Sequence, residues 1–177
     1  MSVKIIHITG ASGSGTTTLA KAIAREFGFT HLDTDDFFWL KTDPPFTRKR
    51  DPASRRLILE KAINEAETCV ISGSLTEWGD EFIPRFDLVI YVTAPTAVRI
   101  ERLKEREYRE LGERILEHGD MYENHQSFLR WAAEYDHGGL NMRSAAHHRM
   151  WLQQITCPVR YVDGTAPICK ILSELPL

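Results

Sequence analysis

A glycine-rich segment near the start of the chain has the residue types and spacing to bind phosphate. Residues 10–17 read G-A-S-G-S-G-T-T, which fits the phosphate-binding loop (P-loop) pattern G-x-x-x-x-G-K-[ST] at both glycines and at Thr17. Thr16 stands where the pattern has lysine. An apolar run precedes the loop and a helical pattern follows it, so backbone N–H groups and a helix N-terminus converge on one spot. We expect a nucleoside triphosphate there, without its usual lysine; a plain Gly/Ser turn is the alternative.

The elements that position this loop follow from the hydrophobic pattern. Short runs rich in β-branched and aromatic residues predict five strands, at residues 3–9, 29–32, 68–72, 88–92 and 159–162. Helical patterns separate them: residues 16–27 ending at Gly28, a helix beginning at Asp51-Pro52, and one near Pro95. Strands that alternate with helices predict an α/β fold with a five-stranded parallel sheet and helices on both faces.

Periodicity also predicts which helix faces are buried. The second helix should bury Leu59, Ala62, Ile63 and Ala66, and the third should bury Ala97, Ile100 and Leu103. A long insertion at residues 108–155 contains two amphipathic helices divided by Gly138-Gly139. The first, after a cap at Asp120, is marked by Met121, His125, Phe128, Ala132 and Tyr135, and the second by Met142, Ala146 and Met150. We expect one domain, residues 1–177, with a lid and helical insertion at about 106–155.

Ligands of such sheets bind beyond the carboxyl ends of the strands. That rule selects five segments: residues 10–17, 33–36, 73–79, 94–95 and 163–167. In the second segment Asp33 and Asp35 are two residues apart, so they point the same way if the backbone is extended. A solvated acidic turn that caps the next helix is the alternative for this pair.

Bulk properties exclude several classes of function. The chain has 177 residues, a formal net charge of −3, 42% hydrophobic and 27% charged residues, which is the composition of a globular protein without a nucleic-acid or membrane surface. Its cysteines, Cys69, Cys157 and Cys169, have no paired spacing. We therefore expect a cytoplasmic protein that binds a small molecule, with neither nucleic acid nor membrane as partner, and leave its oligomeric state open.

With these motifs in place, the chain resembles the small P-loop kinases: the shikimate, gluconate, adenylate and cytidylate kinases. The resemblance covers nearly the whole chain in order of elements, and about a quarter of it in sharp motifs. The run G-S-G-T-T-T at residues 13–18 also resembles archaeal-type cytidylate kinases, which carry threonine at the lysine position. The resemblance implies a P-loop NTPase fold similar to the nucleoside monophosphate kinases, with ATP and Mg²⁺ as cofactors.

The acidic pair gains roles from this resemblance. It implies that Asp33 helps to hold Mg²⁺ through water and that Asp35 faces the hydroxyl group of the acceptor. Phosphoryl transfer agrees with this, since it requires a carboxylate that orients the nucleophile or accepts its proton. The third strand has no Walker B aspartate at its end, so Thr17 and Asp33 would have to hold the metal. Gly73 would present backbone to the substrate, and Trp78 would wall the pocket or simply pack.

Four arginines on the third helix follow three- and four-residue spacing: Arg99, Arg102, Arg106 and Arg109. Like charges at this spacing repel one another, and a bound anion would relieve the repulsion. By resemblance to the adenylate kinases, Arg102 lies by the adenine and Arg106 by the transferring phosphate. We interpret Arg99 and Arg109 as a solvated face balanced by neighbouring glutamates.

The remaining signals are weaker. The turn V-D-G-T-A-P, with Gly164 and Thr165, resembles the adenine-side loop of these kinases, although it also fits a plain turn. Arg48, in the basic run after Pro44-Pro45, suits an acidic or phosphorylated acceptor or is merely exposed. The histidines, including His118, His125, His147 and His148, lack zinc-site spacing.

The leading hypothesis is an ATP- and Mg²⁺-dependent kinase of a small acceptor. Its catalytic residues would be Asp35 and Arg106, with Arg106 covering for the missing lysine. Its nucleotide-binding residues would be Gly10, Ser12, Gly13, Ser14, Gly15, Thr16, Thr17, Thr18, Arg102, Gly164 and Thr165. Thr17 and Asp33 would hold the metal, and Asp35, Arg48, Gly73 and Trp78 would face the acceptor. A nucleotide-binding module or sensor without turnover, or a slow ATPase, is the competing hypothesis, and the acceptor stays open.

Overall fold

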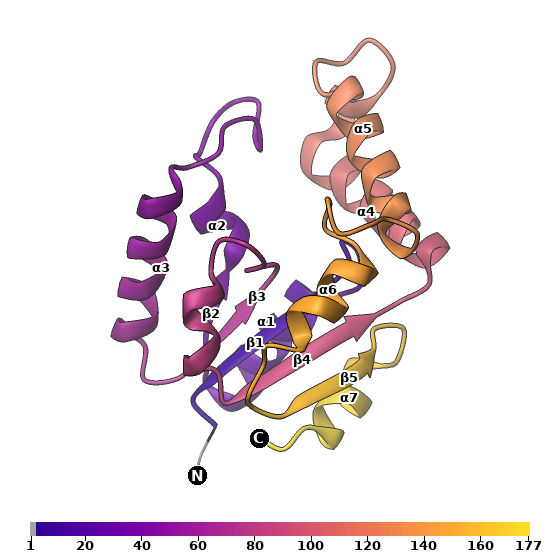
Figure 1. The fold of residues 1–177 in the computed structure, drawn as a ribbon. Coiled ribbons are helices and arrows are strands. Elements are labelled where there is room, and N and C mark those ends of the chain that lie inside the picture. Colours follow the sequence, from indigo (N-terminus) through magenta and orange to yellow (C-terminus); the bar gives the residue numbers. More distant parts are fainter. Residues whose placement is uncertain (1–2) are drawn as a thin grey trace.

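The computed structural model describes residues 3–177 and contains a five-stranded, all-parallel sheet (Figure 1). Its strands are β1 (Ile5–Gly10), β2 (Thr30–Asp33), β3 (Cys69–Ser72), β4 (Leu88–Thr93) and β5 (Val159–Asp163). They lie in the order β2-β3-β1-β4-β5, with β1 at the centre. The predicted fold class is confirmed, and each strand lies within about two residues of its predicted position.

The helices alternate with these strands. The α-helices are α1 (Thr16–Phe27), α2 (Thr34–Phe38), α3 (Pro52–Glu65), α4 (Thr96–Leu111), α5 (Tyr122–Ala133), α6 (Ala145–Leu152) and α7 (Ile168–Glu174). Short 3-10 helices are η1 (Asp80–Arg85), η2 (Gly112–Ile115) and η3 (Glu134–Asp136). Two predicted ends are confirmed: Gly28 closes α1 in the left-handed conformation, and Asp51 caps α3 by accepting from the amide of Ser54 at 3.0 Å.

Apolar side chains cover both faces of the sheet. On one face α1 and α7 pack Leu19, Ile23 and Ile171 against Ile6, Ile8 and Ile90. On the other face α3, η1 and α6 pack Leu59, Ile63, Phe82 and Trp151 against Ile71, Val89 and Tyr91. The central strands β1, β3 and β4 are therefore buried on both sides, which is why they read as continuous apolar runs in the sequence.

Two predicted helix faces are corrected by the structure. Ala97 of α4 is exposed, whereas Arg99 is 1% exposed and takes the position facing the interior. In α6 the buried side chains include His147, His148 and Trp151, whereas Met150 is 42% exposed. Both helices bury polar side chains that hydrogen-bond inside the protein, and hydrophobic periodicity does not count such residues.

The predicted cap of α5 is also wrong. Asp120 makes a bidentate pair with Arg114, at 2.9 and 2.7 Å, and Met121 occupies the N-cap position without a side-chain hydrogen bond. Asp120 therefore orders the η2–α5 connection and leaves the first turn of α5 uncapped by a side chain.

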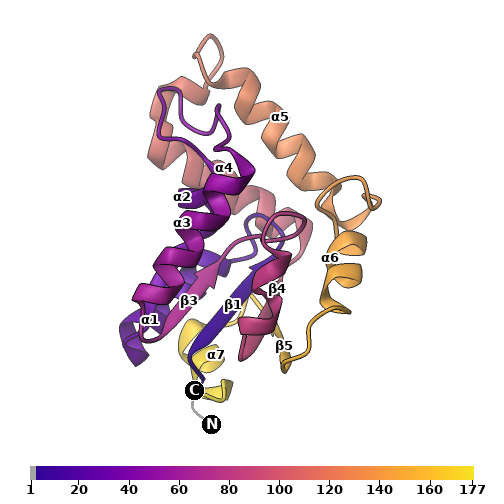
Figure 2. The ribbon, with the colours of Figure 1, turned by 60° about the vertical axis from the view of Figure 1, so that its left-hand side comes forward.

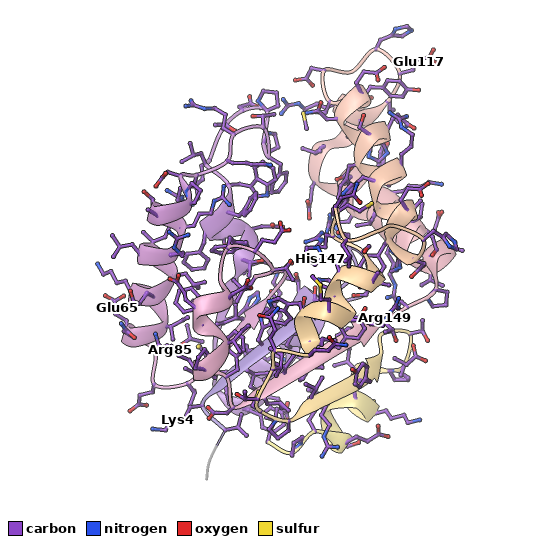
Figure 3. The ribbon with its side chains drawn as sticks, viewed as in Figure 1. Lys4, Glu65, Arg85, Glu117, His147 and Arg149 are labelled. Atoms are coloured by element: carbon purple, nitrogen blue, oxygen red, sulfur yellow. The ribbon has the colours of Figure 1, made fainter. Side chains whose placement is uncertain are left out.

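Two arms rise beyond the carboxyl ends of the strands (Figures 1 and 2). One consists of α2 and the connection at residues 39–51, and the other of α4, η2 and α5. Figure 3 shows Glu117 at the outer tip of the second arm and His147 close to the sheet. The residues before β1, from Val3, and the C-terminus lie at the opposite end of the sheet (Figure 1). Within residues 3–177, no helix combines the length and hydropathy that a membrane span requires.

Candidate active site

The glycine-rich segment forms a tight loop between β1 and α1. Gly13 and Gly15 adopt left-handed backbone conformations, with φ of 80° and 107°, which favour glycine. A Cβ on Gly13 would lie 2.5 Å from the backbone oxygen of Arg99, whereas one on Gly15 would meet nothing closer than 3.9 Å. The space in front of Gly15 is therefore open, at the N-terminus of α1, where an anion is stabilised.

Two cavities open beside this loop. The Trp78 cavity has a volume of about 660 Å³ and lies between the loop, α2, residues 73–78 and the arm formed by α4 and α5. The Gly164 cavity has a volume of about 950 Å³ and lies between the loop, α4 and the turn that follows β5. Thr16, Thr17, Asp33, Asp35 and Arg106 line both cavities. The two cavities therefore adjoin beside the glycine loop.

The other predicted site residues divide between the cavities. Gly10, Ser12, Gly73 and Trp78 line only the Trp78 cavity, and Gly15, Thr18, Arg102 and Gly164 only the Gly164 cavity, while Gly13 lines both. Three residues line neither: Ser14 is fully buried, Thr165 Oγ1 donates to Asp163 Oδ1 at 2.7 Å, and Arg48 is exposed. Lys49 lines the Trp78 cavity in place of Arg48.

Thr17 and Asp33 lie side by side. Thr17 Oγ1 donates a hydrogen bond to Asp33 Oδ2 at 3.2 Å, and Asp33 Oδ1 accepts one from the amide of Asp35 at 3.1 Å. Asp33 therefore caps α2 while one of its oxygens faces the first turn of α1. A hydroxyl and a carboxylate next to a phosphate loop fit the few protein ligands that Mg²⁺ takes when phosphate oxygens and waters complete its octahedron.

Asp35 projects from the first turn of α2 into the space shared by the cavities. Its side chain is exposed to that space, but the surrounding walls enclose it, and this burial raises the pKa of Asp35 above its ordinary value. The charge of Asp33 raises the pKa further, while Arg143 and Arg106 oppose the shift. A raised pKa makes a carboxylate a stronger proton acceptor.

The four arginines of α4 have different environments. Arg102 Nη2 donates to the carbonyl of Gly164 at 3.1 Å, and this bond joins α4 to the turn after β5. Arg106 is exposed, lines both cavities and makes no ion pair with any residue in the range 3–177. Arg109 is exposed and lines the Gly164 cavity.

The interpretation of Arg99 as a solvated residue is wrong. Its guanidinium donates to the carbonyls of Ala94 and Ala132, both at 3.1 Å, and pairs with Asp136 at 2.8 Å. It also lies over the ring of Tyr135, 5.2 Å from the centroid. Arg99 therefore joins the base of α4 to the end of α5, and its role is structural.

The Trp78 cavity has aromatic walls. Trp78 is 9% exposed, and its Nε1 donates to the carbonyl of Ser74 at 2.9 Å, so it both packs and lines the cavity. Gly73, with φ of 113°, lies so close to Thr34 that a Cβ would overlap the hydroxyl of that threonine. The other aromatic side chains that line this cavity are Phe38, Trp39, Phe46, Phe128 and Trp131.

Arg143 is a charged residue of this cavity that no sequence pattern predicts. Arg143, in the connection before α6, donates from Nη2 to Ser12 Oγ at 2.6 Å, although 131 residues separate them. It lines the Trp78 cavity with Asp35 and Arg106. No motif surrounds Arg143 in the sequence; its only signal is its position just after the Gly138-Gly139 division.

Three of the histidines make separate contacts inside the protein and do not form a cluster. His125 Nδ1 contacts a carboxylate oxygen of Glu107, His147 Nδ1 donates to the carbonyl of Met142 at 3.1 Å, and His148 Nδ1 contacts Tyr135 Oη at 2.7 Å. Across the part of the chain that the structure describes, no three side chains of His, Cys, Asp or Glu converge as a metal site.

Comparisons with known proteins agree with the fold. A family model described as an AAA domain matches residues 6–127. The uncharacterized protein YqaC of Bacillus subtilis (strain 168) is 42% identical over 165 residues, which cover 93% of this chain and 91% of that protein. Cytidylate kinase of Pyrococcus furiosus is 30% identical over 137 residues, which cover 68% of this chain and 70% of that enzyme.

Solved structures give the same result for the fold. Shikimate kinase from Acinetobacter baumannii, in complex with shikimate, aligns with a TM-score of 0.54 and 17% identity over 97% of this chain and 92% of that one. Because the identity is low, this similarity supports the fold alone. The family match spans most of the chain, and the identity to cytidylate kinase extends over two thirds of it. The chain therefore belongs to the AAA domain family and to the superfamily of small P-loop kinase-like proteins.

Proposed function

We propose that the protein is an ATP- and Mg²⁺-dependent phosphotransferase that moves the γ-phosphoryl group to a small-molecule acceptor. One observation carries the proposal: Thr17, Asp33 and Asp35 line both cavities at the mouth of the glycine loop. A nucleotide in the Gly164 cavity and an acceptor in the Trp78 cavity would therefore meet beside a carboxylate. The kinase relatives support the same reaction class.

The triphosphate would lie along the loop. Backbone amides of residues 12–16 would donate to its oxygens, aided by the N-terminus of α1. Arg102, held against Gly164 and within 3.4 Å of the carbonyl of Ser14, would form the wall next to the nucleobase. Thr165 is engaged with Asp163, so any contact of its turn with the base would come from backbone atoms.

Thr17 and Asp33 would hold Mg²⁺ together with phosphate oxygens. When bound, the ion would supply positive charge that neutralises the phosphate oxygens during transfer. Thr17 would turn its hydroxyl hydrogen away from Asp33 to offer a lone pair. Asp33 would keep its bond to the amide of Asp35 and so hold α2 in place.

Asp35 would orient the acceptor and accept its proton. A carboxylate with a raised pKa is suited to this step, because general-base efficiency increases as the pKa approaches the working pH. Trp78 and the backbone at Gly73 would limit the size of the acceptor. Hydroxyl acceptors, as in shikimate- and gluconate-type reactions, and nucleoside monophosphates are the candidates.

A nucleotide-binding module without turnover is the second candidate. It is favoured by Thr16 in the lysine position and by Ser72, which ends β3 where a Walker B aspartate would stand and whose Oγ is bonded to His31 Nε2 at 2.8 Å. Such a protein would bind nucleotide through the same loop and release no ADP.

One experiment separates the two candidates. The protein is incubated with Mg-ATP and a pooled metabolite library, and mass spectrometry follows ADP release and any compound that gains a phosphate. ADP release with one phosphorylated product supports the kinase. Release without a product would indicate a slow ATPase. A nucleotide-dependent melting shift with no release at all would replace the kinase by the binding module.

A further inference from the structure

Hydrogen bonds hold the backbone in place on both sides of Arg143. Ser144 Oγ donates to the carbonyl of Gly139 at 2.8 Å and accepts from the amide of His147 at 3.1 Å, as the cap of α6. His147 Nδ1 donates to the carbonyl of Met142 at 3.1 Å. The connection before α6 is therefore ordered by its own side chains, and the guanidinium of Arg143 is aimed from a fixed base.

The guanidinium itself has few protein partners. It lies over the ring of Trp131, 4.8 Å from the centroid, and its Nη2 donates to Ser12 Oγ. Its Nε is fully enclosed and has no hydrogen-bond partner among residues 3–177. Within the same range no carboxylate lies within 4.0 Å of it.

This arrangement leaves a cation that requires an anion. Burial lowers the pKa of Arg143, the charge of Asp35 raises it, and a guanidinium stays protonated under all ordinary conditions. An enclosed charge with no carboxylate of the described chain within ion-pair distance is costly, so an anion that enters the Trp78 cavity beside Ser12 would be favoured. The cavity meets the phosphate loop at that point.

We propose that Arg143 supplies the positive charge on the transferred phosphoryl group that a lysine at position 16 would otherwise supply. The inference rests on the proposed function and names its missing cation. Arg106 is the less suitable group, because it is exposed and no bond with another described residue holds its guanidinium in one place.

The transfer step balances without chemistry on Arg143. The acceptor oxygen forms a bond to the γ-phosphorus, the bond from that phosphorus to the β–γ bridging oxygen breaks, and ADP leaves with the electron pair. The acceptor proton passes to Asp35. Arg143 remains protonated throughout and donates hydrogen bonds to the oxygens of the moving group, which lies between the two cavities.

The test compares two nucleotides that differ in the γ-phosphate. Calorimetric titration with Mg²⁺ gives Kd for ADP and for the non-hydrolysable β,γ-imido analogue of ATP, in the parent and in Arg143→Gln. We expect Arg143→Gln to raise Kd for the analogue by about tenfold or more, since charge-assisted bonds are lost. Kd for ADP should change by less than about threefold on the same grounds.

Arg149→Gln, at an exposed position outside both cavities, is the matched control, Arg106→Gln tests the competing cation, and Thr16→Lys is the rescue. Arg149→Gln should leave the preference for the analogue over ADP unchanged. Thr16→Lys combined with Arg143→Gln should restore most of that preference, because the lysine places a cation on the same phosphate. Melting without nucleotide verifies that each variant is folded. If Arg143→Gln is unfolded, Arg143→Lys takes its place, with a smaller loss for the analogue alone.

Three results would overturn the inference. In the first, a folded Arg143→Gln variant binds both nucleotides equally weakly, which would make Arg143 a support of the loop or a ligand of the acceptor's own anion. In the second, that variant binds both nucleotides as tightly as the parent does. In the third, Arg106→Gln loses the preference for the analogue and Arg143→Gln keeps it. A parent that binds neither nucleotide would instead remove the proposed function, and this inference with it.

Discussion

Thr17 Oγ1 lies 3.2 Å from Asp33 Oδ2, across the gap between the first turn of α1 and the end of β2. The two residues are 16 apart in the chain, yet the parallel sheet brings them together at the edge where β1 and β2 end. Asp33 also caps α2, so its carboxylate has two tasks: Oδ1 accepts from the backbone of α2, and Oδ2 faces Thr17 at the proposed metal site.

Asp33→Asn should separate these tasks. The amide oxygen can still accept from the backbone of Asp35, so the cap is retained while the charge is lost. We expect the gain in affinity that Mg²⁺ gives to the ATP analogue to fall by about tenfold, the lower end for altered metal ligation. Titrations with and without Mg²⁺ measure it. Asp36→Asn, an exposed neighbouring carboxylate, is the control, and an equal loss there would contradict the role.

Asp35→Asn should lower turnover far more than nucleotide affinity. In the parent, burial raises the pKa of Asp35, so the proton-accepting form is lost at a higher pH than for an ordinary aspartate. Turnover should therefore fall as pH decreases through that raised pKa, and the acid limb should be absent from the variant. A pH profile of kcat measures it. Turnover within about threefold of the parent would exclude Asp35 as the base, because such groups contribute about 10²–10⁴-fold.

Gly15→Val should abolish nucleotide binding. Gly15 has φ of 107° and open space in front of it, so a branched side chain is strained and also occupies the place of the phosphate. The melting shift at millimolar ATP analogue should disappear. Gly28→Ala is matched, because φ is 76° and the position lies at the far end of α1. That variant should melt lower yet keep the shift, and a lost shift in both would deny Gly15 a specific role.

Arg99→Met should destabilise the fold. The change removes a buried guanidinium from Asp136 and from the carbonyl oxygens of Ala94 and Ala132. We expect a loss of about 3 kcal/mol in the free energy of unfolding, the lower end for broken buried pairs, since Asp136 is half-exposed. Urea titration measures it. Arg109→Met, exposed on the same helix, should change stability by less than about 0.5 kcal/mol.

Stability should also decrease in mild acid. Burial lowers the pKa of His7 to about 4 and that of His148 to about 3, whereas the unfolded chain takes up both protons near pH 6.5. The free energy of unfolding should therefore be level above pH 6.5 and fall below it, by about 1.4 kcal/mol per pH unit for each proton. Urea titrations of the parent and His148→Gln measure the slope. The variant should lose part of it, while His118→Gln, at an exposed site, should keep it.

The parts of the molecule that can be predicted from the sequence are those with local sequence signals. The glycine loop, the alternation of strands and helices and the pair Asp33 and Asp35 lie within short windows, so pattern and position were sufficient. The rule that ligands bind beyond the carboxyl ends of parallel strands then selected the segments that line the two cavities.

Other residues depend on contacts that no short window contains. Arg143 reaches Ser12 because α5 leads from the outer end of its arm back to the connection before α6 (Figure 2). Arg99 reads as one of two solvated arginines on a helix face that carries four, yet it is buried, and Ala132 near the end of α5 supplies one of its acceptors. In α6 the buried face carries His147 and His148, so an apolar pattern selected Met150 on the wrong side.

The approach of Gly13 to Arg99 restricts how the loop can vary over evolutionary time. The P-loop pattern leaves position 13 free, but here a Cβ would collide with the backbone oxygen of Arg99, in the first turn of α4. A clash with a side chain can be relieved by a second substitution, whereas a clash with a backbone oxygen cannot. We therefore expect that no second substitution makes another residue acceptable at position 13. In related chains that carry another residue there, the backbone at the start of α4 should follow a different path.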